Sequence, residues 1–598
     1  MQAHKTDGSS NHNPTELAKN LAKIAEKSQL IIQEFLSRQA QDAANTPIDP
    51  LNIVNAYSEL FTRMMSDPIS VAEKQINLWH DYMKLWENTT KRLMGNEEAP
   101  IISPDRRDKR FKDETWEKNT VFDFIKQSYL ISSRWIQNSI KDVEGLEEHD
   151  AKKIDFYTRQ FVDAMSPSNF LMTNPEVLKT TIESNGENLV NGLENLLEDI
   201  ENSKKNLRVS MTDRSAFVAG KNIANTKGKV IFRNDLMELI QYEPATKDVY
   251  KTPLLVMPAW INKYYILDLQ EGNSYVKWAV EQGHTVFIIS WVNPDRKLGK
   301  KTFDDYMKEG PLAAIEAIEQ ATGEKEVNVV AYCLGGTLLS ITLAWLQAKK
   351  QQNKIKSATY LTTMIDFSNA GELSVFIDEE QIKLLESKMT EQGYLDGSEM
   401  AMTFNMLRAN DLIWSFVVNN YLLGKDPFPF DLLYWNSDST RMPATMHSFY
   451  LRNMYQKNML LKPNALTIGG EPIDLRTVKT PAYMLSTRED HIAPWQSTYA
   501  ATQIFSGDIR FVLAASGHIA GVINHPTKKK YCYWTNKKLP NSPDEWLNSA
   551  QQEEGSWWSD WNKWQQQFSG DKVPARVIGE GKLKPIEDAP GSYVKVMV

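Results

Sequence analysis

One cysteine, Cys333, stands where a strand-like run of the sequence gives way to a helical one. The run 327–330 is apolar and β-branched, which is typical of a buried parallel strand. Small residues, including Ala331 and Gly335, flank the cysteine, and a helical pattern follows over about 337–349. A nucleophile at the tip of a sharp strand-to-helix turn needs small neighbours, because strand and helix crowd each other there. The pattern therefore predicts that Cys333 is a nucleophile rather than a small core residue.

An acid and a base follow Cys333 along the chain. The run 481–487 predicts a strand that ends just before Asp490, and the run 509–513 predicts the next strand, just before His518. Residues past the carboxyl ends of parallel strands lie at the crevice of an open α/β sheet. Nucleophile, acid and His in this order form the triad of an α/β-hydrolase, and the turn at the cysteine is its nucleophile elbow. His491 lies one strand too early to be the base.

The elements that position these residues predict an α/β-hydrolase catalytic domain over 211–598. From about residue 211, strand-like runs alternate with helical stretches, which is typical of a mostly parallel sheet. The clearest early runs are 229–233, 236–242, 253–257 and 285–290. Between about 367 and 477 the alternation stops, and the sequence becomes helix-rich and aromatic. This insertion before the acid-bearing strand predicts a cap, or lid, over the cysteine.

The first two hundred residues are mainly helical in pattern, so the sequence predicts a helical N-terminal domain over 14–210. Residues 1–13 are polar and are expected to be disordered. The helix near 14–35 has apolar residues along one face, and it either packs on its own domain or docks on an apolar surface or partner. Aromatic residues at helical spacing, such as Trp79 and Trp86, are expected to lie in the core of this domain.

Composition narrows the class of protein further. The chain has 598 residues, 24% of them charged, with a net charge of −8, which argues against a general nucleic-acid partner. Only two cysteines occur, so a reducing compartment is expected, and neither a signal peptide nor a membrane-spanning run is visible. The nine His and two Cys lack the spacing of metal ligands, and neither a metal nor a cofactor is expected.

Stretches along nearly all of the chain resemble one family, the class I polyhydroxyalkanoate synthases. Together these stretches are highly specific, whereas the elbow alone would not be. They are 165–170, 173–176, 230–234, 239–242, 260–269, 332–337, 407–412, 489–495, 517–524 and 589–594. The length of the single chain and its long N-terminal region fit class I better than the shorter classes that need a second subunit.

The resemblance implies an acyltransferase that polymerises (R)-3-hydroxyacyl-CoA into a polyester and releases CoA through an acyl-Cys333 intermediate. Short units such as 3-hydroxybutyryl are the expectation for this class. The resemblance also implies a cytoplasmic homodimer at the surface of polyester granules, with phasin-like granule proteins as further partners.

The triad residues take different roles in this chemistry. Cys333 attacks as a thiolate, and His518 takes its proton. Asp490 orients His518 and stabilises its charged form, or it helps to deprotonate the incoming 3-hydroxyl. The sequence leaves both roles of Asp490 open.

Two further sets of residues are expected to contact the substrate. The oxyanion should meet the backbone N–H of Leu334 and a second backbone N–H near Ile261 and Asn262. Arg408 matches a family position suggested to meet a CoA phosphate, although a surface or lid salt bridge is the alternative.

Two rival functions remain. A Cys-dependent thioesterase or lipase-like hydrolase would use the same triad and would release a free hydroxy acid. A granule-coating scaffold protein would have an elbow that no longer works, although an intact Cys333, Asp490 and His518 argue against it.

Overall fold

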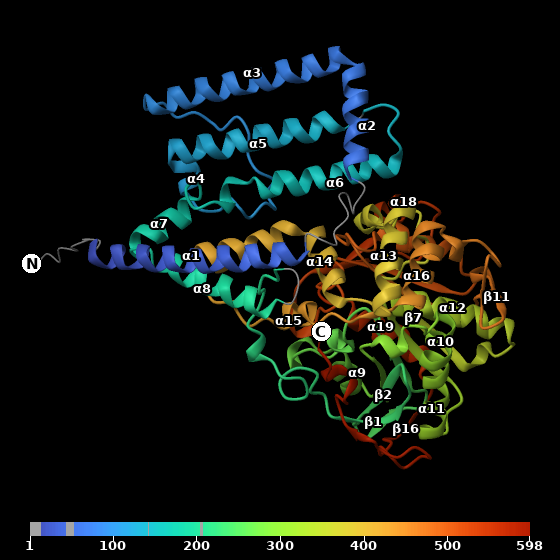
Figure 1. Cartoon of the computed structure of the whole chain (residues 1–598). Coiled ribbons are helices and arrows are strands. Elements are labelled where there is room, and N and C mark those ends of the chain that lie inside the picture. The colour runs from blue at the N-terminus through green and yellow to red at the C-terminus, as the bar shows by residue number, and fades with distance from the viewer. Residues whose placement is uncertain (1–13, 43–52, 142, 204–206, 598) are drawn as a thin grey trace, which may run out of the picture. The chain divides into compact units, whose positions relative to one another are not determined.

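The computed structural model describes residues 14–42, 53–141, 143–203 and 207–597, and the chain divides into two compact units (Figure 1). One unit comprises residues 1–213 together with 404–428, and the other comprises 214–403 and 429–598. The stretch for which the sequence predicts a cap, 367–477, is thus shared between the units. The segment predicted to be disordered, 1–13, lies outside the described residues.

The first unit is built from helices. They are α1 (Pro14–Asp42), α2 (Ile53–Ser66), α3 (Pro68–Leu93), α4 (Thr115–Lys118), α5 (Thr120–Ile140), α6 (Glu148–Ala164), α7 (Pro175–Glu183) and α8 (Glu187–Asn202). The start of α7 shows why helices begin where they do. The Asn174 side chain accepts hydrogen bonds from the N–H groups of Glu176 and Val177, and Pro175 occupies the first helical position, where no N–H is needed.

Helix α3 corrects one expectation, because its aromatic stripe does not lie in a core. Trp79 and Trp86 are 66% and 65% exposed, and Met83 on the same face is 51% exposed. The reason is that α3 packs on α5 through its other face, where Leu85 is fully buried and the Tyr82 hydroxyl lies 2.6 Å from that of Ser132. Helix α3 therefore has two apolar faces, and one of them is open to solvent.

A segment inserted much later in the chain, 404–428, belongs to the helical unit. It contains the π-helical turns η9 (Asn410–Trp414) and η10 (Val417–Leu422), and η10 packs on α8. The approach is close: a methyl group at Gly192 of α8 would lie 1.9 Å from the Tyr421 carbonyl oxygen. Polar side chains of α8 complete the contact, with Asn188 Nδ2 2.7 Å from Leu422 O, Asn195 Nδ2 3.1 Å from Asn420 O and Asp199 Oδ2 2.6 Å from Tyr421 Oη.

The second unit is organised around an 11-stranded sheet with a parallel centre. The strand order is β15-β14-β13-β12-β7-β6-β4-β5-β2-β1-β17; the six strands from β13 to β5 are parallel, and the edge strands on both sides are antiparallel. In chain order the strands are β1 (Gly228–Arg233), β2 (Met237–Tyr242), β4 (Leu254–Met257), β5 (Val286–Trp291), β6 (Val327–Tyr332), β7 (Ile355–Leu361), β12 (Ala482–Thr487), β13 (Ile509–Ala514), β14 (Cys532–Thr535), β15 (Gln551–Glu554) and β17 (Glu587–Asp588).

The central strands are buried on both faces, as their continuous apolar sequences predict. In β6, Val327, Val329 and Ala331 join one hydrophobic cluster, whereas Val330 and Tyr332 join a second cluster on the opposite face. Helices therefore cover both faces of the sheet. The first cluster includes residues of α10 (Phe303–Met307), α11 (Ala313–Thr322), α12 (Leu334–Ala348) and α16 (Ala444–Tyr450), and the second includes residues of α9 (Tyr275–Glu281) and α19 (Trp558–Gln565).

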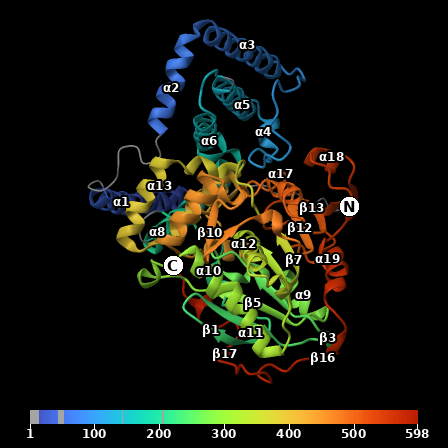
Figure 2. The same ribbon diagram turned by 90° about the vertical axis from the view of Figure 1, so that its right-hand side faces the viewer.

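This layered architecture confirms the predicted fold class, an α/β-hydrolase sheet preceded by a helical region. Helix α12, which begins at the predicted elbow, packs against strand β7, and both are labelled in Figure 2. Insertions between β7 and β12 supply further helices to this unit, namely α13 (Glu379–Gln392), part of α14 (Gly397–Leu407), α15 (Asp431–Ser437) and α16. The carboxyl ends of the parallel strands are thus where the sequence-predicted residues come together.

Candidate active site

Cys333 occupies a strained turn between β6 and α12. Its backbone has φ 53° and ψ −118°, in a region that residues other than Gly rarely adopt. The Cys333 N–H donates to Leu361 O on β7 at 2.9 Å, and the Cys333 carbonyl accepts from Gly336 N at 2.9 Å. Backbone strain of this kind is a recurrent feature of functional sites.

Two glycines allow the turn to pack against its neighbours. A methyl group at Gly335 would lie 2.2 Å from the Met257 carbonyl oxygen, and one at Gly336 would lie 2.0 Å from Thr363 Oγ1. Neither approach leaves room for a side chain. The small residues that the sequence places after Cys333 are therefore required by the backbone at the end of β4 and by Thr363, just past the end of β7.

Asp490 and His518 follow the ends of β12 and β13 and form a direct hydrogen bond. His518 Nδ1 and Asp490 Oδ2 lie 2.7 Å apart, and both residues are buried. The other carboxylate oxygen, Oδ1, accepts from the backbone N–H groups of Ile492 and Ala493, each at 2.9 Å. These contacts fix the carboxylate, so the ring of His518 is held in one orientation.

The charge around His518 raises its affinity for a proton. Burial alone would lower the pKa of His518, but the negative charges at Asp490 and Cys333 and hydrogen bonds to both residues raise it to about 10. These neighbours therefore favour the protonated form of His518, which lies within hydrogen-bonding reach of both partners. Strand ends far apart in the sequence thus bring Cys333, Asp490 and His518 together.

Aromatic side chains from the insertion gather near Cys333. Burial, the neighbouring Tyr455 and the negative charge at Cys333 raise the pKa of Tyr450, and burial and the same charge raise that of Tyr455. The ring centres of Tyr450 and Tyr455 are 5.5 Å apart, and the ring centres of Phe367 and Tyr455 are 5.0 Å apart. Trp260, 6.2 Å from Tyr450, extends this group, which we call the aromatic roof and define as Trp260, Phe367, Tyr450 and Tyr455.

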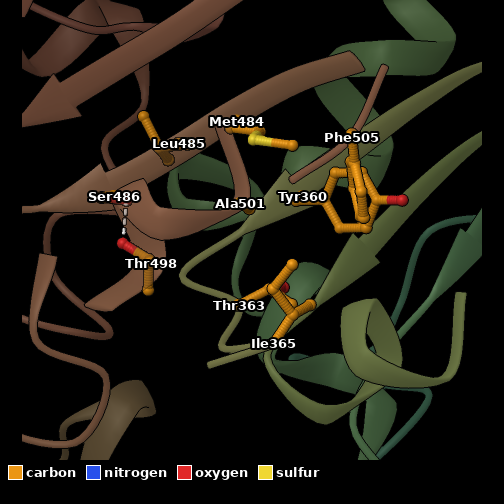
Figure 3. Close-up of a pocket in the computed structure, with 9 residues that line it drawn as sticks. All are labelled: Tyr360, Thr363, Ile365, Met484, Leu485, Ser486, Thr498, Ala501 and Phe505. Carbon is orange, nitrogen blue, oxygen red and sulfur yellow. Dashed lines mark hydrogen bonds between the residues drawn. The ribbon is translucent and has the colours of Figure 1, made fainter. Parts of the chain in front are cut away.

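A second strained backbone position lies beside the elbow, at the end of β7. Thr362 is buried and β-branched, yet it has φ 47°, and its N–H donates to Leu485 O at 2.7 Å. The next residue, Thr363, donates from Oγ1 to the Cys333 carbonyl at 3.2 Å. Thr363 also lines a cavity between β7 and β12 (Figure 3). The cavity holds about 10 Å³, room for about one water molecule, so it cannot take an acyl substrate.

The predicted oxyanion donors lie on two segments that touch each other. Leu334 is the first residue of α12, so its N–H has no intrahelical partner. Ile261 and Asn262 lie in the loop after β4, and this loop approaches Gly335 closely through the carbonyl of its first residue, Pro258. The Ile261 side chain and Cys333 both pack against the same hydrophobic cluster.

Arg408 is the one predicted site residue that the structure places in the other unit. Its side chain is 49% exposed and forms an ion pair with Asp411 on η9. The hydrolase unit therefore does not itself bring Arg408 to the triad. Cys532, the second cysteine, lies at the start of β14, and burial and the nearby Glu554 raise its pKa, opposite to what a reactive thiol needs.

Several residues near Cys333 were not predicted from the sequence. They are Thr363 and Tyr455, together with Tyr450, which the sequence places only among the aromatic residues of the predicted lid. Each lies in a segment with no catalytic motif and reaches the site only through the tertiary fold. Among the described residues, no group of three His, Cys, Asp or Glu side chains forms a metal site, and no described helix is long and apolar enough to cross a membrane.

The fold and this arrangement define an α/β-hydrolase-type catalytic unit with a cysteine at the nucleophile elbow. Two protein-family models match the chain. The model of the alpha/beta hydrolase fold matches residues 252–524, and the model of the poly-beta-hydroxybutyrate polymerase (PhaC) N-terminus matches residues 107–279.

Curated relatives match almost the whole chain. A poly(3-hydroxyalkanoate) polymerase subunit from Rhizobium meliloti is 47% identical over 585 residues, covering 98% of this chain and 95% of the relative. A poly(3-hydroxyalkanoate) polymerase from Methylorubrum extorquens is 50% identical, covering 89% and 88%, and one from Cupriavidus necator is 43% identical, covering 88% and 89%. The chain belongs to the poly(3-hydroxyalkanoate) polymerase family, which confirms the resemblance and the prediction of an enzyme of this kind.

Proposed function

We propose that the chain polymerises (R)-3-hydroxyacyl-CoA, with short units such as 3-hydroxybutyryl, and releases CoA through a covalent acyl-Cys333 intermediate. Family membership supports the reaction. The observation that carries the mechanism is the buried hydrogen bond between His518 and Asp490 beside a cysteine held at a strained elbow.

A cysteine nucleophile suits a thioester substrate. Transfer of the acyl group from the CoA sulfur to Cys333 exchanges one thioester for another, so the two sides of this step are nearly equal in free energy. The acyl-cysteine stays reactive toward an alcohol, whereas an acyl-serine ester would lie lower in free energy. Sulfur therefore suits an enzyme that must pass the acyl chain on repeatedly.

Each acyl transfer is accompanied by a proton transfer through His518. The Cys333 sulfur attacks the thioester carbonyl, and the proton held by His518 passes to the departing CoA sulfur. The 3-hydroxyl of the next unit, itself a CoA thioester, then attacks the acyl carbonyl, the C–S bond to Cys333 breaks, and the Cys333 sulfur leaves as a thiolate. The hydroxyl proton is accepted by His518 or with the help of Asp490. The freed thiolate then takes the lengthened chain from its CoA thioester, and CoA leaves with a proton from His518. The backbone N–H groups at the start of α12 favour the negative charge of each tetrahedral intermediate.

The aromatic roof favours transfer over hydrolysis. Water competes with the 3-hydroxyl for any acyl-enzyme, and apolar rings near the sulfur lower its access. This observation supports a synthase over the alternative, a Cys-dependent thioesterase or lipase-like hydrolase, which shares the triad.

The product of the reaction tests the proposal. We expect the purified chain to release CoA from (R)-3-hydroxybutyryl-CoA while the solution becomes turbid with insoluble polyester. Measuring free thiol and light scattering together separates the alternatives. CoA release without turbidity, with free hydroxy acid as product, would support the thioesterase. Failure to release CoA from short or longer 3-hydroxyacyl units would support the scaffold.

The exposed face of α3 supports the proposal that the enzyme acts at a polyester granule. Trp79, Met83 and Trp86 form an apolar row on this face, and exposed rows of this kind mark interaction sites. The surface of the apolar polyester is the proposed partner, with phasin-like granule proteins as a second. A homodimer and a ligand role for Arg408 toward a CoA phosphate stay further proposals, carried by the family resemblance.

We expect the double substitution Trp79→Ser and Trp86→Ser to weaken adsorption to polyester particles. Each exposed indole that becomes buried contributes about 1.4 kcal/mol or more, or about tenfold in affinity. Co-sedimentation with bare poly-3-hydroxybutyrate particles measures the effect. Phe161→Ser is the matched control, because Phe161 is an aromatic residue of similar exposure (59%) on another helix, α6. Equal adsorption of the double variant and the wild type would contradict the role of α3.

A further inference from the structure

The loop after β4 is held by a segment of the insertion between β7 and β12. The Thr440 hydroxyl donates to the Trp260 carbonyl at 2.6 Å, and the Thr440 N–H donates to the Ile261 carbonyl at 3.2 Å. Nearby, the indole N–H of Trp435 donates to the Lys263 carbonyl at 2.7 Å. Three of the four carbonyls from 260 to 263 therefore face the insertion.

These contacts orient the N–H groups of the same peptides. The peptide bonds on both sides of Ile261 are trans, and in a trans peptide the C=O and the N–H point in opposite directions. Because the Trp260 carbonyl points toward Thr440, the Ile261 N–H points away from it. The Asn262 N–H points away from Thr440 for the same reason. These two N–H groups are the proposed second oxyanion donors.

The loop is coupled to the nucleophile elbow by direct packing. Gly335 lies so close to the Met257 and Pro258 carbonyls that a methyl group there would be 2.2 Å and 3.0 Å from them. The same elbow carries the first oxyanion donor, the Leu334 N–H. Any rotation of the 260–262 peptides thus changes the distance between two donors that must both reach one oxygen.

We infer that Thr440 is a positioning residue that sets the orientation of the oxyanion donors at Ile261 and Asn262. Thr440 is 1% exposed and uses both its hydroxyl and its N–H on this loop. The insertion then does more than cover the cysteine, because it also fixes half of the oxyanion hole. The inference rests on the proposed function in one respect, that attack by Cys333 on the substrate carbonyl forms a tetrahedral oxyanion.

The test substitutes Thr440 by Val, which keeps the shape and removes the hydroxyl. Loss of an oxyanion donor costs about 10²–10³-fold in rate, and a misoriented donor costs less, so we expect kcat for CoA release to fall about 10- to 100-fold. KM should change less than about twofold, because the donors act in the transition state. Thr440→Ser restores the hydroxyl and should recover most of the rate.

A second readout separates positioning from simple support of the cysteine. Iodoacetamide alkylates a thiolate by displacing iodide as the S–C bond forms, and no oxyanion arises. The alkylation rate of Cys333 should therefore stay within about twofold of wild type in Thr440→Val. A parallel loss of alkylation and CoA release would overturn the inference, since Thr440 would then act on the thiolate or on His518. An unchanged kcat would also overturn it.

Two controls complete the design. Thr342 in α12 is fully buried and its hydroxyl donates to Leu338 O at 2.8 Å, so Thr342→Val removes a comparable bond and should keep the wild-type kcat. Trp435→Phe removes the hydrogen bond to the Lys263 carbonyl of the same loop and should also lower kcat. This variant replaces Thr440→Val as the test if Thr440→Val does not fold.

The inference can be separated from the proposed function. If the wild type releases no CoA from any 3-hydroxyacyl-CoA, the proposed function fails. The same variants can then be compared on p-nitrophenyl butyrate, whose cleavage at Cys333 also forms an oxyanion. A lower kcat of Thr440→Val on this ester would support the inference, and an equal kcat would overturn it.

Discussion

Replacing Cys333 by Ala should abolish both CoA release and polyester formation. The acyl group has no other sulfur at the elbow to which it can transfer. His518 and Asp490 act together with Cys333 and cannot replace it as the nucleophile. We expect a loss of at least about 10³-fold in kcat, as for removal of other nucleophiles. The measurement is CoA release from (R)-3-hydroxybutyryl-CoA together with mass spectrometry of the intact protein for a covalent acyl adduct.

The second cysteine provides the control. Cys532 lies on β14, and burial and Glu554 raise its pKa. Cys532→Ala should therefore release CoA at the wild-type rate and should still carry the acyl adduct. An adduct on Cys532 in the Cys333→Ala variant, with activity retained, would contradict the proposed nucleophile.

The second large effect concerns Asp490. Asp490→Asn keeps the shape of the side chain but removes the charge next to His518 Nδ1, 2.7 Å away. Loss of that charge should lower the pKa of His518 from about 10 and favour the wrong tautomer of its ring. The same Asp→Asn change in a Ser-His-Asp triad lowers kcat about 10⁴-fold. We expect a decrease of about 10²–10⁴-fold in CoA release, with the alkaline limb of the pH–rate profile moved to lower pH.

Separate measurement of the two half-reactions distinguishes the two roles proposed for Asp490. Rapid-quench kinetics reports acylation of Cys333, and later CoA release reports elongation. If Asp490 orients His518, both steps slow in the variant; if it acts on the 3-hydroxyl, acylation stays fast and elongation slows. Glu489→Gln makes the same chemical change one residue earlier, at an exposed side chain, and should leave both steps unchanged.

Strand order explains why much of this site could be predicted from the sequence. The elbow is a local pattern, a β-branched run, small residues and one cysteine. Asp490 and His518 each follow a short apolar strand, and parallel strands bring their carboxyl ends to one edge of the sheet. No knowledge of side-chain packing is needed for that step.

The remaining features depend on packing that no local pattern contains. Thr440 reaches the loop after β4 across 180 residues, and Tyr450 and Tyr455 reach Cys333 from a helical insertion whose sequence carries no catalytic motif. The stripe on α3 has the periodicity of a core helix. The tertiary structure shows that α3 packs on α5 through its other face, which leaves Trp79 and Trp86 exposed.

The attachment of 404–428 to α8 bears on how deletion experiments should be understood. Asn188, Asn195 and Asp199 supply hydrogen bonds to this late segment. A chain shortened from its N-terminus past α8 would retain the segment but lose its partners, leaving the carbonyls of Asn420 and Leu422 without these donors. Inactivity of such a shortened protein would then report damage to the insertion between β7 and β12, not a catalytic contribution of the missing helices. Point substitutions on the exposed face of α3 avoid this confusion, because they leave α8 intact.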